Sequence, residues 1–308
     1  FPPRLYMLLS LQKADQGSTK FVPAPSESFM GRFDFHEIPY RFAKYKLHSS
    51  FLVNFWSYFM TLLIILGGVL IIFLLAYFTK NLKGINSTTK SAKQAVKWNF
   101  RIMFFLNYFD LLIIFTSLEF RTLHLDTFLS SLSFIICIGV NLAALIVIYK
   151  SVQVIIALQK SRRVENARNG SEELDQYEIL FKASKDAVYS QHLFMAVFII
   201  RTYLFSLIVG YLFDHPLVQA ILIIILNLAM IVYLILKTPL KLKVKLAQFI
   251  VQELMMLSVN IFVLILAGLD EAESESASFR AVIGDIIIML NLIYNFLATI
   301  FLVLVGLF

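Results

Sequence analysis

Cysteine is nearly absent from this chain, whose 308 residues contain only Cys137. A single thiol excludes an intrachain disulfide, so no such bond holds any part of the fold. Proline is also scarce, and five of the seven prolines lie within the first 50 residues. No proline interrupts the interior of an apolar segment. The sequence therefore lacks the broken helices that are typical of secondary transporters.

Charged residues are few as well, at 15% of the chain, whereas 59% of the residues are hydrophobic and the mean hydropathy is +0.79. Seven apolar segments have about the 20 residues that a helix needs to cross the hydrocarbon core. Helices of soluble domains need a polar face, which these segments lack. We predict an all-α, polytopic membrane protein with seven spans at Phe51–Phe78, Phe100–Leu118, Thr127–Ile148, Leu193–Phe213, Pro216–Leu236, Leu246–Leu269 and Ala281–Phe308.

Catalytic motifs are missing from the sequence. It contains no Walker phosphate loop, no His-Glu-x-x-His zinc pair and no Gly-x-Ser-x-Gly elbow, and its five histidines have no ligand spacing. A potassium-channel filter of the TVGYG type is absent too. We therefore expect a protein that is not an enzyme and that holds no cofactor and no metal ion.

The basic residues predict the orientation of the spans, because cytoplasmic loops accumulate lysine and arginine. Seventeen of them fall after the first, third and fifth spans, whereas the alternate loops hold two. This asymmetry places the N-terminus outside and the C-terminus inside. The net charge of +7 thus lies in loops at the membrane surface. Such placement favours anionic lipid headgroups over nucleic acid as partners.

The spans divide the chain into two parts. Residues 1–50 form a membrane-proximal extracellular segment, and residues 51–308 form the seven-helix transmembrane domain with a helical cytoplasmic loop at 149–192. The third span keeps its apolar pattern through Leu158, so we expect one helix that continues beyond the membrane. Because the chain starts at Phe1 and stops at Phe308 within an apolar run, we expect it to be a piece of a longer polypeptide.

Polar side chains inside the spans are candidates for function, because an ionisable group at the bilayer centre costs about 3 kcal/mol on insertion scales. Spans six and seven carry most of them. They either line a hydrated cation path or, for the amides, bond across neighbouring helices. The candidate ion pathway comprises Glu253, Asn260, Asp285, Asn291 and Asn295.

Two opposite charges occur in spans two and four. Asp110 and Arg201 are candidates for an intramembrane ion pair, since opposite charges on neighbouring spans often neutralise each other. Alternatively, Asp110 belongs to a hydrated cation route. Arg201 is the one basic residue of its span, so a ladder of gating charges is absent and steep voltage sensing is not expected.

Two charged loops flank the sixth span. On the inner side, Lys241, Lys243 and Lys245 are candidate contacts for lipid headgroups, or they act simply as orientation signals. On the outer side, residues 270–275 contain four carboxylates that either concentrate cations at a pore mouth or form an ordinary solvated loop.

Several short motifs resemble one family. They are His215–Gln219, Tyr233–Lys241, Gln248–Glu253 and the aromatic segment Phe33–Tyr45 that precedes Ser49–Leu52. From about Phe51 onward the chain resembles the multi-span C-terminal module of large ciliate- or apicomplexan-like protist surface proteins. Their outer parts carry cysteine-rich repeats, and their membrane part is distantly similar to fungal TRP-like channels. Here Thr238 separates Lys237 from Pro239, where the family has a Lys/Arg-Pro turn.

Three functions follow from these observations. The resemblance implies a TRP-like cation channel, or a channel-like module beneath an extracellular domain, in the plasma or ciliary membrane. The partners would be lipids, other membrane subunits or further copies of the chain, and an extracellular molecule. A receptor or adhesion-type anchor within a larger surface assembly is the second interpretation. A proton- or solute-coupled transporter that uses Asp110 and Arg201 is the third.

Overall fold

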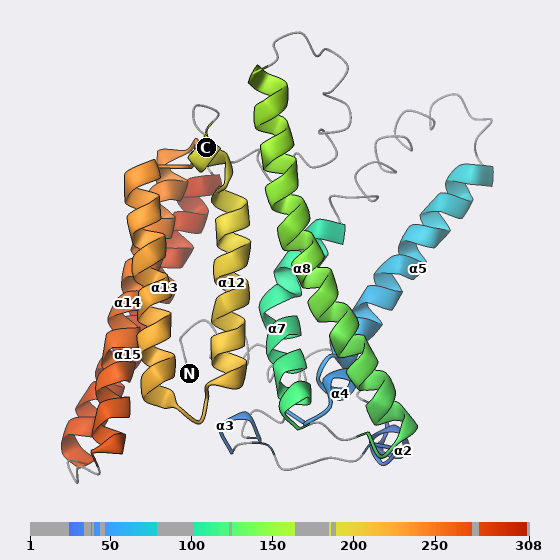
Figure 1. Ribbon diagram of the computed structural model, residues 1–308, viewed down its shortest axis with the longest axis horizontal. Helices are drawn as coiled ribbons and strands as arrows, with labels where there is room; N and C mark the ends of the chain where they lie inside the picture. Colours follow the sequence, from blue (N-terminus) through green and yellow to red (C-terminus); the bar gives the residue numbers. More distant parts are fainter. Residues whose placement is uncertain are drawn as a thin grey trace. The chain divides into compact units, whose positions relative to one another are not determined.

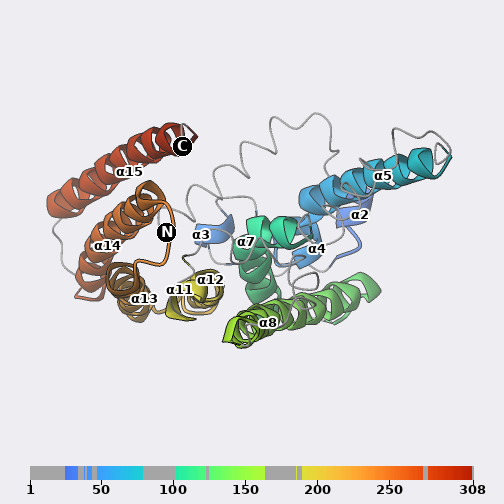
Figure 2. The same cartoon turned by 90° about the horizontal axis from the view of Figure 1, so that it is seen from above.

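The computed structural model consists of helices joined by turns (Figures 1 and 2). It describes residues 25–33, 38, 40–43, 47–78, 101–122, 125–163, 185, 189–272 and 277–306. No strand occurs among these residues, which confirms the predicted all-α class. The chain divides into two compact units: the C-terminal unit contains residues 180–308 with 1–8 and 151–159, and the N-terminal unit contains residues 9–150 and 160–179.

Described helices overlap each of the seven segments predicted to be spans. The first span is α4 (Phe51–Asn54) followed by α5 (Trp56–Phe78), with a break at Phe55 that the sequence did not predict. The second span is α7 (Arg101–Arg121). The third is α8 (Phe128–Arg163), a single helix that extends well beyond Ile148, as expected. Residues 164–184 of the predicted cytoplasmic loop lie outside the described part of the chain.

The last four spans form antiparallel helices of the C-terminal unit, which Figure 2 shows side by side in chain order. They are α12 (Phe194–Tyr211), α13 (Pro216–Lys237), α14 (Lys243–Glu271) and α15 (Ala277–Gly306), preceded by the short α11 (Tyr189–His192). Pro216 stands in the first turn of α13, where its missing N–H breaks no helical hydrogen bond. Thr238 ends α13 in the left-handed conformation, with φ 41° and ψ 57°.

Length and composition make five of the described helical segments long and apolar enough to cross a membrane. They are Phe128–Ala157, Phe194–Tyr211, Pro216–Lys237, Lys243–Glu271 and Ala277–Phe301. Their apolar side chains stand open at the surface: Leu292 and Phe296 of α15 are 65% and 67% exposed. Water disfavours apolar surface of this extent and lipid does not. The protein is thus a multi-pass helical membrane protein, while the number of crossings and their orientation stay predictions.

Among the described residues of the N-terminal unit, a short helix packs on α5 through aromatic rings. Helix α2 (Glu27–Met30) starts at Ser26, whose hydroxyl accepts a hydrogen bond from the Phe29 amide at 3.2 Å. The Phe29 ring lies 4.8 Å from that of Trp56 at the start of α5. A further short helix, α3 (Tyr40–Ala43), follows before α4. The predicted boundary at residue 50 stays a prediction, although α4 does begin at Phe51.

Candidate functional site

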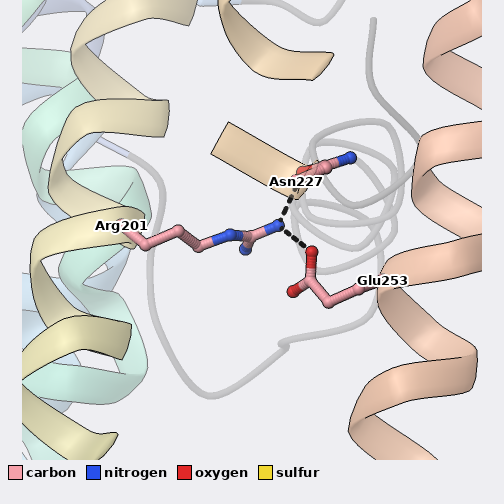
Figure 3. A network of polar contacts seen from close by, with 3 residues as sticks. All are labelled: Arg201, Asn227 and Glu253. Atoms are coloured by element: carbon pink, nitrogen blue, oxygen red, sulfur yellow. Dashed lines mark hydrogen bonds and ion pairs between the residues drawn. The ribbon is translucent and has the colours of Figure 1, made fainter. Parts of the chain in front are cut away.

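A buried ion pair joins two helices of the C-terminal unit (Figure 3). The guanidinium Nη2 of Arg201 on α12 lies 2.8 Å from Oε2 of Glu253 on α14. The same Nη2 also donates to Oδ1 of Asn227 on α13, at 3.0 Å. Exposed fractions are 5% for Arg201, 1% for Glu253 and 0% for Asn227. Three consecutive helices are therefore tied together by one guanidinium.

Burial sets the electrostatic character of this cluster, which we call the Arg201 cluster (Arg201, Asn227 and Glu253). Each charge alone would pay several kcal/mol of desolvation, and their mutual attraction with added hydrogen bonds offsets that penalty. The Phe205 ring, one turn further along α12, lies 5.9 Å from the guanidinium carbon and adds a weak cation–π attraction. The cluster is consequently neutral as a whole, and its charges are committed to each other.

Further polar atoms lie buried in the same helices. Within the described residues, the hydroxyls of Thr202 and Ser206 and the amide nitrogens of Asn227 and Asn260 have no hydrogen-bond partner. Asn260 stands two helical turns beyond Glu253 on the same side of α14 and is 2% exposed. Polar side chains therefore continue past the ion pair inside the bundle.

The residues predicted to line an ion path fall into two groups. Glu253 and Asn260 are buried in α14. On α15, Asn291 is half-buried and donates to the Ile287 carbonyl of its own helix, whereas Asp285 and Asn295 are exposed. The structure therefore brings Glu253 to Arg201 and Asn227 and leaves the polar side chains of α15 on a separate surface.

The predicted ion pair of Asp110 with Arg201 stays a prediction, because the two residues belong to different units and each unit is described by itself. Asp110 lies buried on α7 of the N-terminal unit, with 6% of its surface exposed. Sequence reasoning missed the partnership of Arg201 with Glu253. The signal available was the position of Glu253, which lies ten residues into α14 and far from the snorkelling range of the helix end.

A second polar junction, in the N-terminal unit, was also missed. The carboxylate Oε2 of Glu119 accepts hydrogen bonds from the Phe51 amide at 2.6 Å and from the Ser133 hydroxyl at 3.0 Å. This contact caps α4 from another helix, because Ser50, the residue before α4, makes no side-chain cap of its own. Nearby, the Asn54 side chain exchanges two hydrogen bonds of 2.7 Å with the backbone of His48. Burial lowers the pKa of the His48 imidazole, which favours its neutral form.

The charged loops around α14 are partly described. Asp270 pairs with Arg280 at 3.0 Å; Asp270 is exposed and Arg280 is half-buried. Asp214, His215, Asp270 and Glu271 line a cavity of about 390 Å³ between the α12–α13 turn and the end of α14. Residues 273–276 of the predicted acidic loop lie outside the described part of the chain. At the other end of α14, Lys241 and Lys243 are exposed and Lys245 is half-buried.

Comparison with protein-family profiles, with curated proteins and with solved structures gave no match. Fold and site together define a class: a multi-pass membrane protein of α-helices with a neutral polar cluster inside its C-terminal unit.

Proposed function

We propose that this chain is a non-enzymatic subunit of an oligomeric cation channel, in which α15 lines the ion path. The observation that carries the proposal is a row of exposed polar side chains on a membrane-length helix: Asp285, Asn295 and Thr299. The proposal keeps the seven-span topology with the N-terminus outside and the C-terminus inside, in the plasma or ciliary membrane.

The three polar side chains share one side of α15. Asp285 and Thr299 are 14 residues apart, which is close to four full turns, and Asn295 is one turn before Thr299. At 1.5 Å per residue the row covers about 21 Å, most of a hydrocarbon core of about 30 Å. Its length therefore suits a path across the bilayer rather than a local contact at the membrane surface.

Contact of these polar side chains with lipid is energetically unfavourable. A carboxylate near the bilayer interior costs about 3 kcal/mol on insertion scales, so ionisable residues of spans face protein or water. Asp285 and Asn295 are nevertheless exposed on the chain as it stands. The opposite side of α15, with Ile283 at 3% exposure, packs inward. Leu292, two turns from both Asp285 and Thr299, is 65% exposed on the same side, so this surface mixes polar and apolar groups and the proposal places other subunits against it.

The Arg201 cluster supports the choice of α15 over α14. The Glu253 carboxylate is already neutralised at 2.8 Å by Arg201, so its charge contributes little to attracting a mobile cation. Asp285, by contrast, is exposed. We therefore assign Asp285, Asn295 and Thr299 to the path and give Glu253 the role of holding α12, α13 and α14 together through Arg201 and Asn227.

The carboxylates at one end of α14 fit a cation entrance. Asp214, Asp270 and Glu271 line the same cavity; Asp270 is paired with Arg280 at 3.0 Å, so Asp214 and Glu271 supply the negative charge that attracts cations near the start of α15. A mouth of this sign followed by a polar helix favours cations over anions.

The test is current measurement with the purified chain in planar bilayers. Asp285→Asn is expected to lower cation conductance and cation selectivity, and Asn295→Leu to reduce conductance by removing a polar group from the path. Ile293→Leu is the matched control, because Ile293 is 43% exposed on the other flank of the same helix. Currents that are the same in all three variants and in the unaltered chain would refute the assignment of the path.

A receptor or membrane anchor would give a different result in the same preparation. It would show no cation current in the unaltered chain and a defined monomer in the membrane. The oligomeric state, measured by single-molecule photobleaching in the same bilayers, therefore separates the two functions.

A further inference from the structure

The turn between α13 and α14 presents lysines on a rigid base. Thr238 and Pro239 leave α13, Leu240 turns inward with 1% exposure, and α14 begins at Lys243. Leu240 packs in a core with Phe194, Met230 and Leu234. The rings of Phe194 and Phe249 meet edge to face at 5.3 Å beneath this core. The turn is consequently fixed in place by apolar packing rather than left as an open loop.

A distant lysine is brought to this turn. The backbone amide of Lys185 donates to the Pro239 carbonyl at 2.7 Å, and the Lys185 ammonium donates to the Thr238 hydroxyl at 3.3 Å. Alongside it, the Gln191 side chain donates to the Lys237 carbonyl at 3.0 Å. Contacts from a segment 53 residues upstream therefore complete the surface, which we call the lysine turn: Lys185, Lys237, Lys241, Lys243 and Lys245.

The ionisable residues of the lysine turn that the structure describes all carry positive charge. Lys237, Lys241 and Lys243 are exposed, and Lys185 and Lys245 are half-buried. Described residues 185, 189–192 and 237–246 include no acidic residue. The first turn of α14 adds to this field, since it holds no acid and Leu242 gives it no side-chain cap. Lysines are electrostatically unfavourable at the N-terminus of a helix, because that end carries partial positive charge. A bound anion would interact favourably with both the lysines and the helix end.

We propose that the lysine turn binds the phosphate headgroup of an anionic phospholipid from the surrounding membrane. The apolar spans Pro216–Lys237 and Lys243–Glu271 end and begin at this turn, so its lysines stand at headgroup depth. Positive-inside bias alone would give loop lysines without a fixed arrangement. Here Lys185 is instead held at the turn by the 2.7 Å hydrogen bond from its backbone amide to the Pro239 carbonyl. The inference needs the membrane location only and is independent of ion conduction.

The test measures lipid affinity of the full chain by native mass spectrometry from detergent micelles, with phosphatidylglycerol titrated against phosphatidylcholine. Each lysine near an anionic surface contributes about a fivefold gain in affinity. Lys241→Gln, Lys243→Gln and Lys245→Gln together should therefore weaken phosphatidylglycerol binding on the order of a hundredfold. Lys185→Gln alone should weaken it about fivefold. Phosphatidylcholine binding should not change in either variant.

The matched control removes the same charge elsewhere: Lys83→Gln, Lys90→Gln and Lys93→Gln, from another basic loop of the same predicted side. Its affinity should stay within about twofold of that of the unaltered chain. Equal weakening in both triple variants would overturn the proposal, because net charge rather than the lysine turn would then govern binding. Competition by inorganic phosphate at the same concentration as the lipid would overturn it too, in favour of a site for free anions. Circular dichroism of each variant checks that its helices are intact.

Discussion

The guanidinium of Arg201 and the carboxylate of Glu253 lie 2.8 Å apart although 52 positions separate them in the chain. Asn227, from the helix between them in sequence, accepts a hydrogen bond from the same nitrogen. Helices in lipid lack a hydrophobic force that would drive them together, so polar contacts and close packing fix their arrangement. One nitrogen atom and its two acceptors thus link α12, α13 and α14, alongside the apolar packing of these helices.

Removing only one charge of the Arg201–Glu253 pair should destabilise the protein far more than removing both charges. Arg201→Met leaves the Glu253 carboxylate buried without its counter-charge, and we expect a loss of about 3–5 kcal/mol in the free energy of unfolding. Arg201→Met combined with Glu253→Met buries no charge and should recover most of that loss. Unfolding by SDS titration in mixed micelles, followed by circular dichroism, measures both variants.

The control for this pair is Leu254→Met, beside Glu253 but 45% exposed, which should unfold like the unaltered chain. A double variant no more stable than Arg201→Met would show that the charges do not act on each other.

Glu119 should stabilise the start of the first span through the Phe51 amide. Glu119→Ala leaves a buried N–H without an acceptor, and we expect it to cost about 2 kcal/mol in unfolding free energy. Glu119→Gln keeps an oxygen at that place and should cost less. Hydrogen exchange of the Phe51 amide reports on this contact directly, and equal protection in both variants would contradict the capping role.

The sequence predicted features that depend on neighbouring residues better than contacts between residues far apart in the chain. The length and apolarity of a segment are local properties, so the helices at Pro216–Lys237 and Phe194–Tyr211 were predicted within two residues of their ends. The contact of Arg201 with Glu253 depends on the rotation of two helices about their axes, which single-sequence reasoning did not provide. The Glu119 cap was missed for the same reason, because its acceptor and donor lie 68 positions apart.

Thr238 is the one described residue other than glycine with a positive φ. A β-branched side chain in this left-handed region is strained by about 1–2 kcal/mol, and glycine is the usual residue after a helix end. We expect Thr238→Gly to raise the thermal midpoint of unfolding and Thr238→Ala, which keeps its Cβ, to leave it nearly unchanged. Both substitutions remove the hydrogen bond that the Lys185 ammonium donates to the Thr238 hydroxyl. Because this bond is long, at 3.3 Å, its loss should lower the stability only slightly.

The near absence of cysteine provides a test of the proposed assembly around α15. Cys137 is the chain's single cysteine and has 0% exposure, so mild oxidants should not reach it in the folded protein. The Asn295→Cys variant then carries one accessible thiol on the polar row, and the Ile293→Cys variant carries one on the other flank. A disulfide forms only between residues whose Cα atoms are about 4.4–6.8 Å apart, which requires the two helices to be in contact.

If copies of α15 surround a common axis with Asp285 and Asn295 facing inward, oxidation should convert Asn295→Cys to covalent dimers on denaturing gels and leave Ile293→Cys monomeric. Dimers of Ile293→Cys without dimers of Asn295→Cys would place the apolar flank between the copies and the polar row away from the axis.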